Sequence, residues 1–372
     1  MNSPTPLVPL LEELQAGDLE ALTRGAAILG TGGGGDPYIG YLQLREVLRA
    51  NGPVEVVGMD KVPDEAFVLP FAGIGAPTVS LEKPDDLESI HLLAAVLERR
   101  FQRKPTHIAC LEIGGGNSAL PVIAASVLNL PVIDGDAMGR AFPEIQMVLP
   151  ALYGVNASPL AVVDEKGNSV LVEATSHLSG ERFARAVTVA MGCSAIMACY
   201  AMTGRQARDS FVPASLSKSV ALGNTSHAVL DPGQIPFAIA DFLGGRVVFA
   251  GKVTDVDRST SGGFLRGVAT ISGLDNYRAS SLELSFQNEH LAVVIDDAVI
   301  TTAPDLIAVV ETSTGNPITT ENLRYGQRVS VVTAPCDDRW HSPEGLELVG
   351  PRAFGLSYGP VRWNGQHTEG TV

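Results

Sequence analysis

The segment from Thr106 to Asp134 constrains the fold more than any other part of the chain. It contains an apolar run, THIACLEI, a glycine turn, GGGN, a helical pattern, SALPVIAASVLN, and a second apolar run, PVID. A strand, a helix and a second strand in this order form a βαβ unit, whose strands are parallel and joined by a right-handed crossover. The sequence therefore predicts an α/β domain with a mixed sheet that contains this parallel pair.

The flanking sequence adds elements of the same kind. Apolar residues at helical spacing predict helices over three ranges, and β-rich runs predict strands over two others. The helices are expected at Asp18–Leu29, Tyr38–Ala50 and Pro84–Phe101, and the strands at Val54–Met59 and Ala66–Phe71. A hairpin is expected over Leu160–Ala174, and a further helix over Gly180–Met191. All these elements suit an α/β domain.

Beyond Gly245 the pattern changes to short β-rich segments separated by turn residues. They are RVVFAGKV, FLRGVATI, SLELSF, LAVVIDD, LIAVVE and RVSVVTA. Such a series is typical of a mainly β domain. Because 372 residues exceed what one hydrophobic core usually serves, we expect two domains: an α/β domain over 10–175 and a mostly β domain over 176–366.

Charge and composition exclude several kinds of partner. The chain has 26 Lys and Arg against 41 Asp and Glu, a formal net charge of −15. A surface this negative disfavours nucleic acid and anionic membranes. We find no signal-peptide pattern and no membrane-length apolar run. The four cysteines lack CxxC spacing, so a reducing, cytoplasmic location is expected. The sequence is compatible with a homo-oligomer that associates through the β domain.

The first candidate site is the glycine-rich loop GTGGGGDP. A helix rather than a strand precedes it, unlike a dinucleotide fingerprint, and no GK[ST] follows, unlike a phosphate-binding P-loop. We therefore expect no nucleotide cofactor. Four consecutive glycines let a ligand approach the backbone, and we expect Gly33, Gly34 and Asp36 to contact it. The alternative is a tight helix–helix crossing that has no room for side chains.

The second candidate site, EIGGGNS, lies between the first strand and the helix of the βαβ unit. Open α/β sheets bind ligands at this position. Glu112 and Asn117 offer polar side chains, while Gly115 and Gly116 offer backbone N–H groups. The alternative role for Asn117 is to cap the helix.

The third candidate site, VIDGDAMGRAFPEIQ, follows the next strand of the same unit. Asp134 and Asp136 are therefore expected beside Glu112, with Arg140 and Glu144 nearby. Neighbouring carboxylates push their pKa values apart, which suits one to act as a base and another as an acid, or they bind a divalent cation. The alternative is an Asx turn with helix caps.

Two further observations concern binding and metals. In FQNEHL, four consecutive polar residues, Gln287 to His290, interrupt a strand pattern. Asn288 is a candidate ligand contact; the alternative is that these residues form an internal polar network. The seven histidines form no HxH, HExxH or His–Cys pair at ligand spacing, which leaves His177, His227 and His290 as polar-flanked candidates. A divalent metal such as zinc stays open.

Several of these motifs together resemble one family. They are GTGGGGDPYIG, EIGGGNS, DGDAMGRAFPE, FQNEHL, APDLI, LRYGQRV and VGPRAFGLSYGPV. The chain is similar from about Asp18 to Arg362 to the S-methyl thiohydantoin desulfurase-like family, formerly a domain of unknown function, with N- and C-terminal domains. The resemblance implies cleavage of a C–S bond in an S-methyl thiohydantoin, giving a hydantoin and methanethiol, and a link to hydantoinase/oxoprolinase-type enzymes.

Such a hydrolysis needs a base, an acid and donors that hold the ring. As a hypothesis, Asp134 or Asp136 activates water, Glu112 or Glu144 handles the second proton, and Asn117 orients the ring with the Gly114–Gly116 amides. Three alternatives stay open: hydrolysis of a related cyclic amide, a non-catalytic ligand-binding subunit of a hydantoinase-type enzyme, and a nucleotide-binding enzyme. The glycine-loop pattern argues against the last of these.

Overall fold

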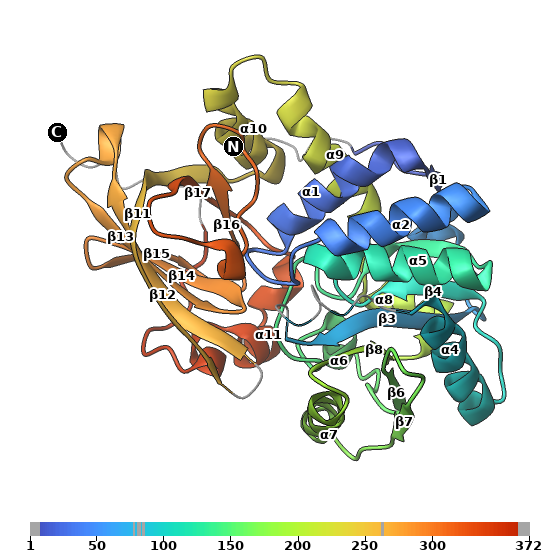
Figure 1. Ribbon diagram of the computed structural model, residues 1–372. Coiled ribbons are helices and arrows are strands. Elements are labelled where there is room, and N and C mark those ends of the chain that lie inside the picture. Colours follow the sequence, from blue (N-terminus) through green and yellow to red (C-terminus); the bar gives the residue numbers. More distant parts are fainter. Residues whose placement is uncertain (1–7, 77–78, 80–82, 84–85, 262–263, 364–372) are drawn as a thin grey trace.

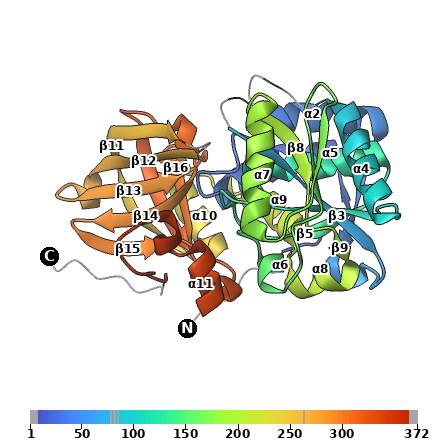
Figure 2. The same cartoon turned by 90° about the horizontal axis from the view of Figure 1, so that it is seen from below.

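The computed structural model describes residues 8–363 except 77–78, 80–82, 84–85 and 262–263. Figure 1 shows two sheets: a mixed sheet covered by helices, in blue to green, and an antiparallel sheet, in orange to red. Figure 2 shows the same two parts from below, with α7 lying against the first. The predicted fold class, an α/β domain followed by a mainly β domain, is confirmed.

The first sheet has the strand order β1-β2-β5-β4-β3-β8-β6-β7. These are β1 (Glu13–Leu14), β2 (Val54–Gly58), β5 (Val132–Asp136), β4 (His107–Cys110), β3 (Phe67–Gly75), β8 (Ser194–Ala198), β6 (Leu160–Val163) and β7 (Ser169–Val172). Strands β2, β5, β4 and β3 are parallel, so the predicted parallel pair is confirmed, and β8, β6 and β7 join antiparallel. Two short strands, β9 (Met202–Thr203) and β10 (Val212–Pro213), pair with β3 and β5.

Helices cover both faces of this sheet. The elements are α1 (Leu19–Leu29), α2 (Tyr38–Asn51), α4 (Leu87–Phe101), α5 (Ala119–Leu128), α6 (Leu149–Leu152), α7 (His177–Ala190), α8 (Gly204–Ser210), α9 (Ser215–Asn224) and α10 (Ile235–Leu243). Alternation along β3 separates two cores: Leu69 and Phe71 pack with α1, α2, α4 and α5, whereas Val68 and Ala72 pack with α6, α7 and α8. Both faces are therefore buried, as parallel strands require.

Helices α1 and α9 cross at two glycines that leave no space for a side chain. A Cβ atom on Gly25 would overlap the carbonyl oxygen of Ser219, and one on Gly223 would overlap that of Ala21. The close crossing is one reason why a region far along the chain packs against the first helix.

We expect Gly25→Ala to lower the free energy of unfolding by about 1–3 kcal/mol, because the methyl group forces the helix backbones apart. Chemical denaturation measures the change. Gly17→Ala is the matched control, since a Cβ there meets nothing within 4 Å, and it should stay within about 0.5 kcal/mol of wild type. Equal stability of the two variants would contradict a tight crossing.

The second sheet is antiparallel in the order β15-β14-β13-β12-β11-β17-β16. Its strands are β11 (Arg246–Ser261), β12 (Phe264–Gly273), β13 (Ser281–Gln287), β14 (Glu289–Ile295), β15 (Ala298–Thr302), β16 (Leu306–Glu311) and β17 (Arg328–Ala334), followed by α11 (Pro343–Val349). Alternate residues of β17 face two cores. Val329 and Val331 pack within this sheet, whereas Val332 and Ala334 join the core of α1 and α10.

The division expected near residue 175 stays a prediction. Strand β8 and helices α7 to α10 follow that position in the chain, and β8 pairs with β3 in the first sheet. The segment after β17 also returns to the helices and loops around the first sheet: Arg339 donates to the carbonyl oxygens of Ser210 and Phe211, at 3.0 Å each, and Trp340 Nε1 to that of Met138, at 2.9 Å. In the described part of the chain, no helix has the length and apolarity to cross a membrane.

Candidate functional site

A cavity of about 180 Å³ lies where the glycine-rich loops of the first domain meet the β13–β14 turn of the second. Its described lining includes Gly34, Asp36, Glu112, Gly116, Asn117, Glu144, Asn288 and Glu289. Apolar residues form much of the rest of the wall, Ile74, Leu111, Leu120, Ile123, Met138, Phe142, Ile145 and Met197, and the polar residues Gln43, Arg185 and Ser194 also line it. The volume is below the range of about 300–1,000 Å³ typical of drug-sized ligands, so the cavity suits a small ring.

The two predicted glycine loops interlock beside this cavity. The N–H of Gly116 donates to the carbonyl oxygens of Gly34 and Gly35, at 2.9 and 3.2 Å. Gly34 and Gly115 have positive φ, and a Cβ atom on either would overlap the other loop. A Cβ on Gly33 would overlap the side chain of Glu289. Gly34 and Gly116 line the cavity, while Gly33 and Gly115 make the close packing behind it.

Glu112 follows the end of β4 and is the predicted residue with the clearest chemical signature. Its side chain is buried, and its Oε1 accepts a hydrogen bond from Asn117 Nδ2. Burial raises the pKa of Glu112 to about 8, although the Asn117 amide and the Phe142 N–H lower it in part. Glu112 therefore carries a proton at neutral pH. Asn117 in turn accepts from the Gly73 N–H at 2.6 Å, which fixes its orientation.

Glu289, at the start of β14, is a cavity residue that sequence reasoning did not select. It is buried, and in the described part of the chain its Oε2 has no hydrogen-bond partner. Burial raises the pKa of Glu289 well above its usual range, and the charge of Glu112 adds to the increase, whereas Arg140 lowers it. The polar FQNEHL motif signalled this position, but Asn288 was the residue chosen from it.

The raised pKa of Glu112 predicts a pH dependence of stability. The folded pKa of about 8 lies above the ordinary value of 4.5, so the folded state binds more protons between these values. The contribution of Glu112 to the free energy of unfolding is complete below the ordinary pKa and is lost as pH rises through about 8. We expect Glu112→Gln to reduce the fall in unfolding free energy between pH 5 and 8. Urea unfolding at both pH values measures this.

The exposed Glu88 on α4 gives the control for this experiment, since Glu88→Gln should leave the pH dependence as in wild type. Asp136, whose pKa burial raises to about 6, contributes in the same direction in all three proteins. Its charge also raises the pKa of Glu112, so the comparison includes the interaction between these two carboxyl groups. Identical slopes for wild type and Glu112→Gln would mean that Glu112 is ionised in the folded state.

Three other polar residues of the wall have partners that fix them. Asp36 Oδ2 accepts from Asn322 Nδ2 at 3.0 Å. Asn288 has φ +56°, its Oδ1 accepts from the Leu265 N–H at 2.8 Å, and the side chain holds the β13–β14 turn. Glu144 is half-buried and accepts a hydrogen bond from Gln146. All three line the cavity, so the structure brings them together with Glu112.

Asp134 and Asp136, in contrast, are not among the described lining residues. Asp134 accepts from the N–H of Leu216, at 2.9 Å, and from Ser217 Oγ, at 2.5 Å, at the start of α9. Asp136 accepts from the N–H groups of Ile113, Met138 and Gly139, at 2.8–3.1 Å, and from Ser215 Oγ, at 2.5 Å. Both carboxylates thus join α9 and the loops to the end of β5, in the manner of helix caps and turns.

Arg140 also lies outside the described lining. It is fully buried and donates to the carbonyl oxygens of Pro304, at 2.6 Å, and Asp305, at 2.8 Å, and to Thr31 Oγ1, at 2.7 Å. These contacts join the loop after β5 to the β15–β16 turn and to the end of the first helix. The structure therefore places Arg140 between the domains.

The described histidines among the three candidate metal ligands, His177 and His290, have different partners and do not form a common site. The His177 ring stacks on Tyr200, and its Nδ1 is 3.1 Å from the Tyr200 hydroxyl. His290 is buried with Nδ1 2.9 Å from the Ile307 carbonyl oxygen, and burial lowers its pKa to about 4. The side chain of His227 lies outside the described residues. Neither described histidine belongs to a group of Asp, Glu, Cys and His side chains close enough to share a metal.

Comparison with known proteins supports the fold and points to a family. One family model, described as S-Me-THD-like, N-terminal domain, matches residues 17–174, and another, S-Me-THD-like, C-terminal domain, matches residues 175–361. A solved structure of a protein from Chromobacterium violaceum is similar over 94% of this chain and 98% of that chain, with 23% identity and a TM-score of 0.78. No curated protein gave a significant match.

Proposed function

The chain belongs to the S-Me-THD-like family in both of its domains, and on that premise we propose that it hydrolyses the C–S bond of an S-methyl thiohydantoin-like ring. The products are a hydantoin and methanethiol. The observation that carries the proposal is the burial of Glu112, which raises its pKa to about 8, in the wall of a small cavity lined by both polar and apolar residues. A neutral carboxylic acid in such a site can donate a proton during C–S cleavage.

The reaction moves the two protons of water, one to the ring nitrogen and one to the departing sulfur. Water attacks the ring carbon that carries sulfur, a carboxylate takes one water proton, and the electron pair of the ring C=N bond moves to nitrogen, which receives that proton from the carboxylate. The C–S bond then breaks as the hydroxyl oxygen forms the new carbonyl group; Glu112 gives its proton to the departing methanethiolate, and the hydroxyl proton, taken by the same carboxylate, restores the protonated Glu112. Glu144, a carboxylate on the same cavity wall, is the residue we assign to activate water, in place of Asp134 or Asp136, whose oxygens accept internal hydrogen bonds.

The other wall residues bind the ring. Hydrogen bonds with Glu112 and Gly73 hold the Asn117 side chain in place. Its second amide hydrogen and the second lone pair of its oxygen therefore have fixed directions, in which they can bind a ring carbonyl or a ring N–H. The unpartnered Oε2 of Glu289 can donate a hydrogen bond while the acid is neutral, because burial raises its pKa. The thioether methyl group fits the apolar part of the wall formed by Met138, Phe142 and Met197.

The direct test is incubation of the purified full chain with an S-methyl thiohydantoin in oxygen-18 water. Methanethiol is followed with a thiol reagent and the ring product by mass spectrometry. We expect equal amounts of thiol and hydantoin, with one oxygen-18 in the hydantoin. Unlabelled product, or methanol with a thiohydantoin, would place bond cleavage elsewhere and contradict this mechanism.

The alternative is a non-catalytic subunit that binds a hydantoin-like metabolite for a hydantoinase-type enzyme. The same experiment separates the two functions, because such a subunit binds the ring, seen as thermal stabilisation, and releases no thiol. A related cyclic amide as substrate would appear as ring opening without thiol release when a panel of unsubstituted hydantoins and imides is tested.

A further inference from the structure

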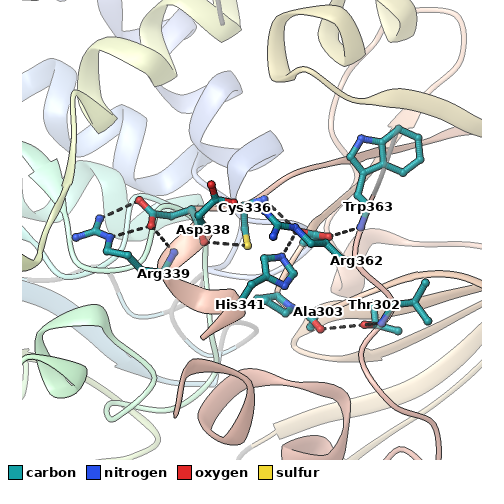
Figure 3. A network of polar contacts seen from close by, with 12 residues as sticks. Thr302, Ala303, Cys336, Asp338, Arg339, His341, Arg362 and Trp363 are labelled. Atoms are coloured by element: carbon teal, nitrogen blue, oxygen red, sulfur yellow. Dashed lines mark hydrogen bonds and ion pairs between the residues drawn. The ribbon is translucent and has the colours of Figure 1, made fainter. Parts of the chain in front are cut away.

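A second group of reactive side chains lies away from the cavity, where the segment after β17 meets the β15–β16 turn. Asp305 is in the β15–β16 turn, Cys336 follows β17, and His341 ends the 3-10 helix η8 (Asp338–His341). One ligand atom from each lies within 4.8 Å of the other two. Figure 3 shows the Cys336 sulfur beside the His341 ring. Two chain segments thus bring a carboxylate, a thiol and an imidazole to one point.

We propose that Asp305, Cys336 and His341 bind a divalent metal ion of the zinc type. Sulfur, nitrogen and oxygen donors together are the ligand set that zinc prefers. Tetrahedral zinc, with bonds of about 2.0–2.3 Å, needs ligand atoms roughly 3.4–3.7 Å apart. The three ligand atoms now lie within 4.8 Å of one another. On binding, His341 Nε2 and Asp305 Oδ1, now 2.9 Å apart, would exchange their mutual contact for the metal.

The surroundings of the three side chains hold them in place. The carboxylate of Asp305 is fully buried, and the side chain of His341 is 9% exposed. Asp305 accepts from the N–H groups of Cys336, at 3.1 Å, and Trp363, at 2.5 Å. Such contacts orient a ligand before the metal arrives. Arg140 donates to the Asp305 carbonyl oxygen at 2.8 Å, and in the metal-bound state the Cys336 thiolate and the Asp305 carboxylate would offset the charge of its guanidinium.

The position indicates a structural role. None of the three residues is among the described lining of the cavity. Between Cys336 and His341, however, Arg339 and Trp340 make the contacts to Ser210, Phe211 and Met138 around the first sheet. A bound metal would fix both ends of this segment, and through Met138 it would support the loop that carries the cavity residue Phe142.

Cobalt binding tests the site without any assay of activity. The reduced, tag-free full chain is treated with a chelator, dialysed and titrated with Co²⁺. We expect one equivalent to bind, with the visible bands of tetrahedral cobalt and a thiolate-to-cobalt charge-transfer band, and Zn²⁺ should displace it. Cys336→Ser should lose the charge-transfer band, whereas Cys193→Ser, a change at a partly exposed free cysteine, should retain it.

The wild-type spectrum alone can overturn the proposal if Cys336→Ser fails to fold. Absence of the charge-transfer band at saturating Co²⁺, or a band that survives in folded Cys336→Ser, would reduce the cluster to a buried Asp305–His341 pair with a neighbouring thiol. His341→Asn gives the second comparison, with weaker Co²⁺ binding expected by at least tenfold.

Discussion

Glu112→Gln is expected to lower the rate of methanethiol release by about 10²–10⁴-fold, the usual contribution of a general acid. Glutamine keeps the size of the side chain and the carbonyl oxygen that accepts from Asn117, but it has no proton to transfer. Because Glu112 is buried and its pKa is about 8, the neutral amide should leave stability unchanged or improved. A loss of rate with retained stability therefore separates catalysis from folding.

The pH profile of the wild-type rate provides an independent check. If Glu112 must be protonated, the rate falls as pH rises through about 8. This alkaline limb should be absent from the residual activity of Glu112→Gln, while the control Glu88→Gln retains both rate and profile. A Glu112→Gln rate within a few-fold of wild type would remove Glu112 from the mechanism.

Arg140→Met is expected to lower the free energy of unfolding by about 3–5 kcal/mol, because the buried guanidinium is a charged donor whose removal leaves several buried acceptors unsatisfied. The change leaves buried carbonyl oxygens of Pro304 and Asp305 and the hydroxyl of Thr31 without their donor, and each unsatisfied group costs about 1–3 kcal/mol. It also removes the guanidinium 4.4 Å from the Phe142 ring centre. Equilibrium unfolding in urea measures the loss.

Two variants refine the interpretation of Arg140. Arg140→Lys should recover only part of the stability, because an ammonium group cannot reproduce the planar set of donors that reaches two separate segments. Arg49→Met changes an exposed arginine, whose side chain is 83% accessible, and should stay within about 0.5 kcal/mol of wild type. A loss below about 1 kcal/mol for Arg140→Met would show that water replaces the missing donors.

Local patterns predicted the elements well because strands and helices depend on neighbouring residues. The parallel pair β4 and β5 and the hairpin of β6 and β7 are confirmed. The strand predicted over Thr106–Ile113 ends at Cys110, because the chain turns there and the Ile113 N–H donates to Asp136 instead. The helix predicted from Pro84 is described from Leu87, and residues 84–85 lie outside the described part.

The site was harder to predict, because its geometry depends on contacts between distant segments. The carboxylate of Asp134 accepts hydrogen bonds from Leu216 and Ser217. Both residues belong to α9, a helix that the sequence pattern does not predict. Glu289 reaches the cavity because the β13–β14 turn packs against a glycine loop near the other end of the chain. Nothing local to either sequence segment indicates these encounters.

The core that contains Leu22 and Phe71 also contains Val332 and Ala334 of the second sheet. Apolar surface on each half is thus withdrawn from water only when the other half is present. If either half were expressed separately, it would expose a hydrophobic surface and tend to aggregate. The two halves should therefore melt in a single cooperative transition, and a ligand that contacts both Glu112 and Glu289 should raise the temperature of that transition without splitting it.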